Sequence, residues 1–198
     1  VTYAGQPTTA TALVIAPNAM GHPQKLRKTV VWAHGTVGVV PDCAPSAKSG
    51  AATRLPGVEE ILQRGWVLVA PDYAGLGPGR PHAYLDKAEA ATAIHDAVRA
   101  AQQVPDTFAG PQFVVWGHSQ GGHAALAVAL ANSQAPDLVM KGAVAVAPPT
   151  DLVENTRTMA KLIRGVLTSM SMVSWPQTYG NSTASVVPFI DGINRVGR

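Results

Sequence analysis

Short, continuously apolar runs recur along the chain and alternate with longer segments whose apolar residues have helical spacing. A run that is apolar at consecutive positions is typical of a strand buried on both faces of a sheet. Proline or glycine follows closely after each run, as expected where a strand ends. The runs predict five strands, at residues 9–16, 29–33, 66–70, 112–116 and 141–147.

The segments between these strands predict helices. Residues 56–64 begin with proline and acidic residues and are followed by Gly65, as is common for a short helix. Asp86 and Glu89 form a capping-box arrangement ahead of an apolar face that consists of Ala90, Ile94, Val98 and Ala101. Strands that alternate with helices predict an α/β fold with a mostly parallel, doubly wound sheet.

Residues 151–175 have a different pattern, with apolar residues on one helical face and charged residues on the other. We expect one amphipathic helix that is either a lid over an apolar acyl pocket or an ordinary packing helix. The pocket residues of the lid are expected to be Met159, Ile163, Val166 and Met170. The chain then divides into a core at 1–150, a helical insertion at 151–180 and a loop at 181–198 that leads to a missing or cleaved C-terminal segment.

Composition restricts the class of protein. The 198 residues are 46% hydrophobic and 14% charged, which is typical of one globular domain. The net charge of +3 comes from dispersed residues, so we expect no nucleic-acid partner. No apolar stretch reaches the roughly 18 residues that a transmembrane helix needs. Asp42 and Cys43 have no further ligand at metal-binding spacing, so we expect neither metal nor cofactor.

The segment from Gly117 to Gly121 carries the strongest chemical signal. Its sequence Gly-His-Ser-Gln-Gly follows a predicted strand and precedes an Ala-rich helical run. A serine at such a strand-to-helix turn projects its hydroxyl above the sheet, and the two glycines let strand and helix approach closely. We therefore expect Ser119 to be a nucleophile, with a surface turn as the alternative, and the Gln120 N–H to bind an oxyanion.

A second candidate element follows the strand at 29–33. His34, Gly35 and Thr36 come directly after it, and a His-Gly loop in this place commonly supplies the second oxyanion donor of a serine hydrolase. We expect that donor to be the Thr36 backbone N–H, with Gly35 allowing the close approach. His34 is expected to brace the loop.

Several short segments together resemble the secretory lipase family of α/β-hydrolases: His34–Thr36 with Cys43–Ser46, Asp72-Tyr73 with Gly75–Gly77, Pro81–Leu85, and Gly117–Gly122. The resemblance implies Ser119 as nucleophile, Gln120 and the Thr36 loop as the oxyanion hole, and an inserted helical cap. It also implies small lipophilic carboxylic esters as substrates. Amide hydrolysis on the same machinery and a non-catalytic binding module remain the alternatives.

The chain departs from this family in its histidines. The order in this fold is Ser, then Asp or Glu, then His, but no histidine follows His123. Asp151 is a conceivable acid, yet an acid without histidine does not activate a serine. We therefore expect this chain to be the amino-terminal product of a cut precursor, with Val1 as a cut end and a secreted or cell-envelope location. A second polypeptide segment is expected to supply the acid and the histidine, with or without a disulfide to Cys43.

Overall fold

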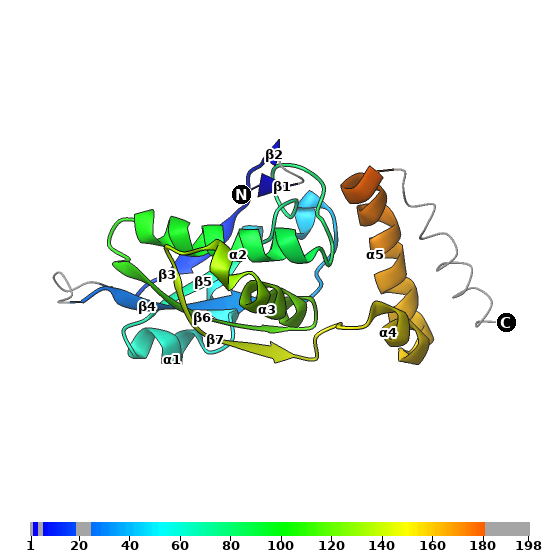
Figure 1. Ribbon diagram of the computed structural model, residues 1–198. Helices are drawn as coiled ribbons and strands as arrows, with labels where there is room; N and C mark the ends of the chain where they lie inside the picture. Colours follow the sequence, from blue (N-terminus) through cyan, green and yellow to red (C-terminus); the bar gives the residue numbers. More distant parts are fainter. Residues whose placement is uncertain (1, 4–5, 19–24, 181–198) are drawn as a thin grey trace.

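Five strands form the central sheet in the order β3-β5-β4-β6-β7. In this computed structural model, which describes residues 2–3, 6–18 and 25–180, β4, β5, β6 and β7 are parallel and β3 is antiparallel (Figure 1). A separate small sheet pairs β1 (Thr2–Tyr3) with β2 (Gln6–Pro7). The main strands are β3 (Ala12–Ile15), β4 (Arg27–Ala33), β5 (Val67–Pro71), β6 (Ala109–His118) and β7 (Val139–Val146). The predicted α/β class and mostly parallel sheet are confirmed.

Helices cover both faces of this sheet. In Figure 1, α2 (Lys87–Gln103) and α3 (Gln120–Leu130) lie on one side, and α1 (Val58–Gln63) lies on the other. The larger core lies beneath α2 and α3, where Val31, Val69 and Val115 of the strands are fully buried. Such β-branched residues pack well on a pleated surface. The described residues also form four one-turn 3₁₀ helices without buried residues: η1 (Pro41–Cys43), η2 (Pro45–Ala47), η3 (Ala52–Arg54) and η4 (Asn132–Gln134).

At the start of α2, one of the two hydrogen bonds of the predicted capping box forms and the other does not. The Asp86 carboxylate accepts a hydrogen bond of 2.8 Å from the Glu89 N–H, and the predicted apolar face of the helix is buried. The Glu89 side chain does not bond back to the cap. It accepts the Ala74 N–H at 2.8 Å instead, so a buried carboxyl ties α2 to the loop after β5.

The strand β7 differs from its prediction as a buried strand. Val139, Val144 and Val146 are 41%, 57% and 45% exposed. The reason is that β7 lies at the edge of the sheet and pairs only with β6 among the described residues. Apolar sequence alone predicted burial, but the number of neighbours of a strand depends on its place in the sheet.

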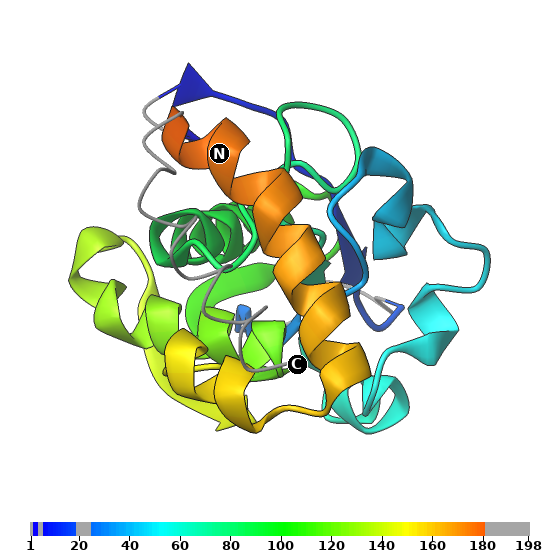
Figure 2. The same ribbon diagram turned by 90° about the vertical axis from the view of Figure 1, so that its right-hand side faces the viewer.

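The insertion after β7 forms two helices where one was expected. The helix α4 (Leu152–Thr158) ends at Met159, whose backbone is extended, and α5 (Lys161–Tyr179) begins after Ala160, whose backbone is also non-helical. Figure 1 shows α5 beside the carboxyl ends of the strands, and Figure 2 shows it crossing that end of the molecule. The expected loop at 181–198 lies outside the described residues.

Candidate active site

Ser119 lies at the sharp turn between the end of β6 and the start of α3. Its backbone has φ 57° and ψ −118°, a region that is sparsely populated by residues other than glycine and costs on the order of 1–3 kcal/mol. Two backbone hydrogen bonds hold this conformation: Ser119 N–H donates to the Val146 carbonyl at 2.9 Å, and the Ser119 carbonyl accepts from His123 N–H at 3.0 Å. Neighbouring structure therefore maintains a strained serine.

The two glycines that flank the turn occupy places with no room for a side chain. A Cβ atom at Gly117 would overlap the backbone of Gly121, and one at Gly121 would overlap the Ala33 carbonyl. The end of β6, the first turn of α3 and the end of β4 are thus in backbone contact. This contact explains why glycine stands on both sides of Ser119.

The loop after β4 lies against the same turn. A Cβ atom at Gly35 would be 3.8 Å from the Ser119 Cβ and 3.2 Å from the His118 carbonyl oxygen. Within the described residues, the backbone N–H groups of Thr36 and Gln120 donate no hydrogen bond to the protein. The structure therefore brings the Gly35–Thr36 loop and the Ser119 turn together and leaves both amides available to an oxygen atom.

The side chains of Gln120 and Thr36 are each held by a residue of one loop. Gln120 is buried, and its Nε2 lies 2.9 Å from the His82 Nε2. The other ring nitrogen of His82, Nδ1, is 2.9 Å from the Ala74 carbonyl, which can only accept, so Nδ1 carries the proton and Gln120 donates to Nε2. Thr36 Oγ1 is 2.8 Å from the hydroxyl of Tyr84. The sequence marked the Pro81–Leu85 segment but did not reveal these two contacts.

Asp72 is a buried carboxylate beneath the site. It accepts hydrogen bonds from Thr11 Oγ1 at 2.6 Å, from the Ser46 N–H at 2.9 Å and from the Ser46 hydroxyl. The His34 Nδ1 lies 2.6 Å from the Gly35 carbonyl and Nε2 lies 3.4 Å from the Asp72 carbonyl, and the neutral ring donates to one of the two. The Asp72 bonds join Thr11, next to β3, and Ser46 of η2 to the end of β5. The His34 ring lies against the backbone of its own loop and of Asp72, which are contacts that the expected bracing role requires.

None of the described histidines hydrogen-bonds the Ser119 hydroxyl. Burial lowers the pKa of His34 and His123, and lowers the pKa of His82 to about 4, so these rings are neutral at pH 7. His118 adjoins Ser119 but is exposed. His22 lies outside the described residues. The part of the chain that the structure describes thus contains an elbow serine without a paired general base.

The expected pocket residues of the insertion are not gathered around one cavity. Ile163 and Val166 are 54% and 47% exposed, and Met170 is half-buried. Met159 lines a small cavity of about 40 Å³ between α4 and α5. This volume is too small for an acyl chain, so the assignment of these four residues to a substrate pocket stays a prediction.

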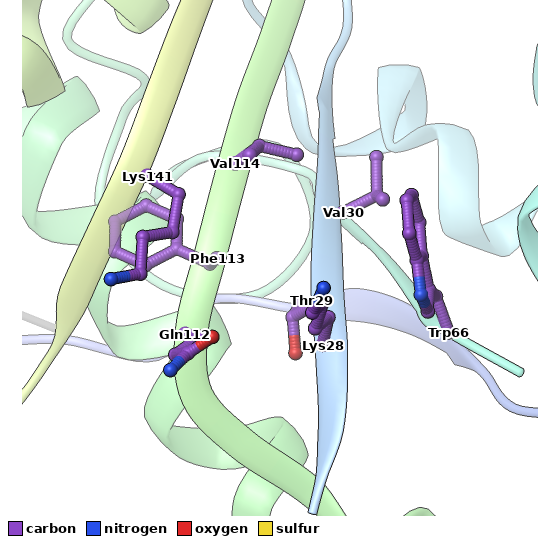
Figure 3. A pocket seen from close by; sticks show the side chains of 8 residues that line it. All are labelled: Lys28, Thr29, Val30, Trp66, Gln112, Phe113, Val114 and Lys141. Carbon is purple, nitrogen blue, oxygen red and sulfur yellow. The ribbon is translucent and has the colours of Figure 1, made fainter.

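Two of the larger hollows differ in their position relative to Ser119. One, of about 280 Å³, lies between Lys28, Trp66 and Lys141, toward the amino ends of the parallel strands and away from the turn (Figure 3). The other, of about 360 Å³, lies at the carboxyl ends of the strands and is lined by Trp32, His34, Val37 and other mostly apolar residues. Of these two, only the second adjoins the loop that carries Thr36. A third and larger hollow among the described residues, of about 590 Å³, lies beside α1 and is lined by Ile61, Trp66 and Trp116 among others.

Residues 2–3, 6–18 and 25–180 contain no group of three or more His, Cys, Asp or Glu side chains that could hold a metal ion. In the same ranges, no helix has the length and apolar character to cross a bilayer. Cys43 is a half-buried free thiol.

Comparison with known proteins gives consistent results. Residues 51–181 match the model of a family described as "Secretory lipase". The fold is similar to the rice cell wall degrading esterase LipA from Xanthomonas oryzae, with a TM-score of 0.71 and 23% identity over 89% of this chain and 49% of that one. Candida antarctica lipase A has a TM-score of 0.66 and 21% identity, over 90% of this chain and 43% of that one.

A putative hydrolase from Legionella pneumophila has a TM-score of 0.66 and 18% identity, over 88% of this chain and 48% of that one. The chain therefore spans less than half of the length of these structural relatives. No curated protein sequence matches it.

Proposed function

Because the chain belongs to the secretory lipase family, we propose that it carries the nucleophile of an exported serine ester hydrolase. Ser119 is the nucleophile, and the backbone N–H groups of Gln120 and Thr36 form the oxyanion hole. The substrates are carboxylic esters with an apolar acyl part.

The observation that carries this proposal is the strained backbone of Ser119 between two glycines that admit no Cβ. A surface turn does not need this arrangement, because strain persists only where the surrounding structure imposes it. A strand, a sharp turn and a helix with serine at the tip is the structural context that a nucleophile elbow requires. The proximity of Gly35 to Ser119 adds the second part of the machinery.

The proposed reaction has two acyl-transfer steps. The Ser119 hydroxyl gives its proton to a base while Oγ bonds to the ester carbonyl carbon. The carbonyl oxygen becomes an oxyanion that accepts from the Gln120 and Thr36 N–H groups. The bond to the alcohol then breaks, and the alcohol leaves with a proton. Water attacks the acyl-serine in the same way, releases the carboxylic acid and returns the proton to Ser119.

The base and its acid partner are proposed to come from polypeptide that corresponds to the part of the structural relatives this chain does not span. Two observations support this: no described histidine bonds Ser119, and β7 has exposed valines at the sheet edge. Such an edge is a ready surface for a further strand. The intact masses of an active preparation should show polypeptide in addition to residues 1–198. That polypeptide should contain a histidine that is essential for turnover. Full activity from residues 1–198 alone would contradict this.

The hollow of about 360 Å³ that adjoins the Thr36 loop supports the proposal that the substrate has an apolar acyl group. Its lining includes Leu13, Trp32 and Val37, and such mostly apolar clefts are typical of ligand pockets. We propose it as the place where part of the acyl chain lies.

The test is to compare matched p-nitrophenyl butyrate and p-nitrobutyranilide with the active protein. The proposal predicts ester turnover at least about a hundredfold faster than anilide turnover, with both lost in Ser119→Ala. Preferential anilide turnover would assign an amide hydrolase to the same serine. Binding of both without turnover would favour a non-catalytic module.

A further inference from the structure

Polar contacts attach the helix α5 to the loop that holds His82 and Tyr84. Several of its large apolar residues are exposed, including Leu162 at 80%, Ile163 at 54% and Val173 at 50%. In contrast, Ser174 is only 1% exposed, which makes it the buried residue of α5. A small hydroxyl side chain at the most buried point of a helix indicates that hydrogen bonding determines how the helix is seated.

The buried hydroxyl of Ser174 both donates and accepts a hydrogen bond. It donates to the His82 carbonyl at 2.6 Å and accepts from the Tyr84 N–H at 2.8 Å. The neighbouring Trp175 donates its indole N–H to the Tyr84 carbonyl at 2.9 Å. Three hydrogen bonds from two consecutive residues of α5 therefore hold the backbone of residues 82–84, which we name the brace.

The side chains of His82 and Tyr84 extend from the brace to the side chains of Gln120 and Thr36, the two residues whose backbone N–H groups are the proposed oxyanion donors. His82 accepts from the Gln120 side chain at 2.9 Å, and the Tyr84 hydroxyl is 2.8 Å from Thr36 Oγ1. Both rings are 1% exposed, and His82 stacks with Tyr73 at 6.0 Å between ring centroids. The backbone of His82 also packs directly on Gly75, where a Cβ would overlap it. The contacts with Gly75, Tyr73 and α5 therefore leave the brace little freedom to shift.

Not every polar atom of the Gln120 side chain has a hydrogen-bond partner among the described residues. The Gln120 Oε1 is buried and has no hydrogen-bond partner in the described part of the chain. An unsatisfied buried amide oxygen costs about 1–3 kcal/mol. With Oε1 unpaired, the bond from Nε2 to His82 is the hydrogen bond that orients this side chain among the described residues. The orientation of Gln120 thus depends on the position of His82.

We propose that Ser174 is a positioning residue that couples the seating of α5 to the geometry of the oxyanion hole. With α5 in place, Ser174 holds the brace, and His82 and Tyr84 hold the side chains of Gln120 and Thr36. When α5 moves away, the brace loses three hydrogen bonds. His82 and Tyr84 then hold the side chains of Gln120 and Thr36 less firmly. This inference deepens the proposed function and rests on it.

The test compares Ser174→Ala with Ser169→Ala on the same helix, whose hydroxyl bonds only the Gly165 carbonyl of α5 itself. Both are made in the active protein. The readouts are the rate at which a fluorophosphonate labels Ser119 and the separate values of kcat and KM for p-nitrophenyl acetate. Ser174→Ala should lower the labelling rate and kcat by about tenfold with KM within twofold, since removal of an oxyanion donor itself costs 10²–10³ in kcat. Ser169→Ala should change neither, and Ser174→Thr, which keeps the hydroxyl, should recover most of kcat.

A second variant covers the case in which Ser174→Ala does not fold. Tyr84→Phe removes the contact with Thr36 from the other end of the brace, and it should lower kcat by a similar factor at unchanged KM. In the double variant the two effects should be less than additive, because they act through one chain of contacts. Unchanged kcat and labelling in folded Ser174→Ala and Tyr84→Phe would overturn the inference while Ser119 labelling of the unmodified protein still supports the proposed function. Absence of Ser119 labelling in the unmodified protein would overturn both.

Discussion

A Cβ atom at Gly121 would overlap the carbonyl oxygen of Ala33, so the first turn of α3 rests directly on the end of β4. This contact places the Ser119 turn beside the loop that carries Gly35 and Thr36. The relative position of nucleophile and oxyanion donors is therefore determined by backbone packing between two neighbouring strands.

The first prediction concerns this contact. Gly121→Ala should destabilise the protein by about 1–3 kcal/mol, as overpacking of a close contact does, and should abolish labelling of Ser119. Gly165→Ala is the matched control, because nothing lies within 4 Å of a Cβ added there. It should stabilise α5 by about 0.5–1 kcal/mol, since alanine is the better helix former. Urea unfolding of both variants measures the difference, and equal stabilities would show that the contact has no effect.

The second prediction concerns the buried carboxyl of Glu89. Burial raises its pKa from 4.5 to about 8. The folded state therefore binds a proton that the unfolded state releases between these values, and stability falls as pH rises from about 5 to 8. Glu89→Gln can still accept the Ala74 N–H but does not titrate. The free energy of unfolding of Glu89→Gln, relative to that of the unmodified protein, should rise by more than about 1 kcal/mol between pH 5 and pH 8. The reason is that each pKa unit corresponds to about 1.36 kcal/mol.

The control for Glu89 is Glu59→Gln, at an exposed position of α1. Its free energy of unfolding should parallel that of the unmodified protein over the same pH range. Buried histidines change stability in the opposite direction, but they are common to all three proteins and cancel in the difference. A constant difference between Glu89→Gln and the unmodified protein would show that Glu89 does not titrate in this range.

The third prediction concerns the exposed apolar face of α5. Replacing Ile163 and Val166 with Asp should change stability little, because both side chains are about half exposed and surface substitutions usually stay within ±0.5 kcal/mol. If this face contacts the acyl chain, kcat/KM should fall more for a decanoate ester than for an acetate ester. Each lost methylene contact is worth about 0.8 kcal/mol. Equal losses for both esters would identify α5 as an ordinary packing helix.

The sequence predicted the elements that depend on local pattern. The apolar face of α2, the strand before Ser119 and the glycines beside it follow from hydrophobic periodicity and from the needs of a sharp turn. The break at Met159–Ala160 and the exposure of β7 did not follow, since they depend on tertiary neighbours. The brace was missed because its contacts join residues far apart in the sequence, 38 positions for His82 and Gln120 and 90 for Tyr84 and Ser174.

The most direct test of the proposed function is covalent labelling of the active protein with a fluorophosphonate, followed by peptide mass mapping. The label should be found on Ser119, because it is the serine at the strained turn with two free amides beside it. Ser119→Ala should lose the label and esterase turnover together while its free energy of unfolding does not fall. Label on a different serine, or an active preparation whose Ser119 stays unlabelled, would contradict the assignment of Ser119 as the nucleophile.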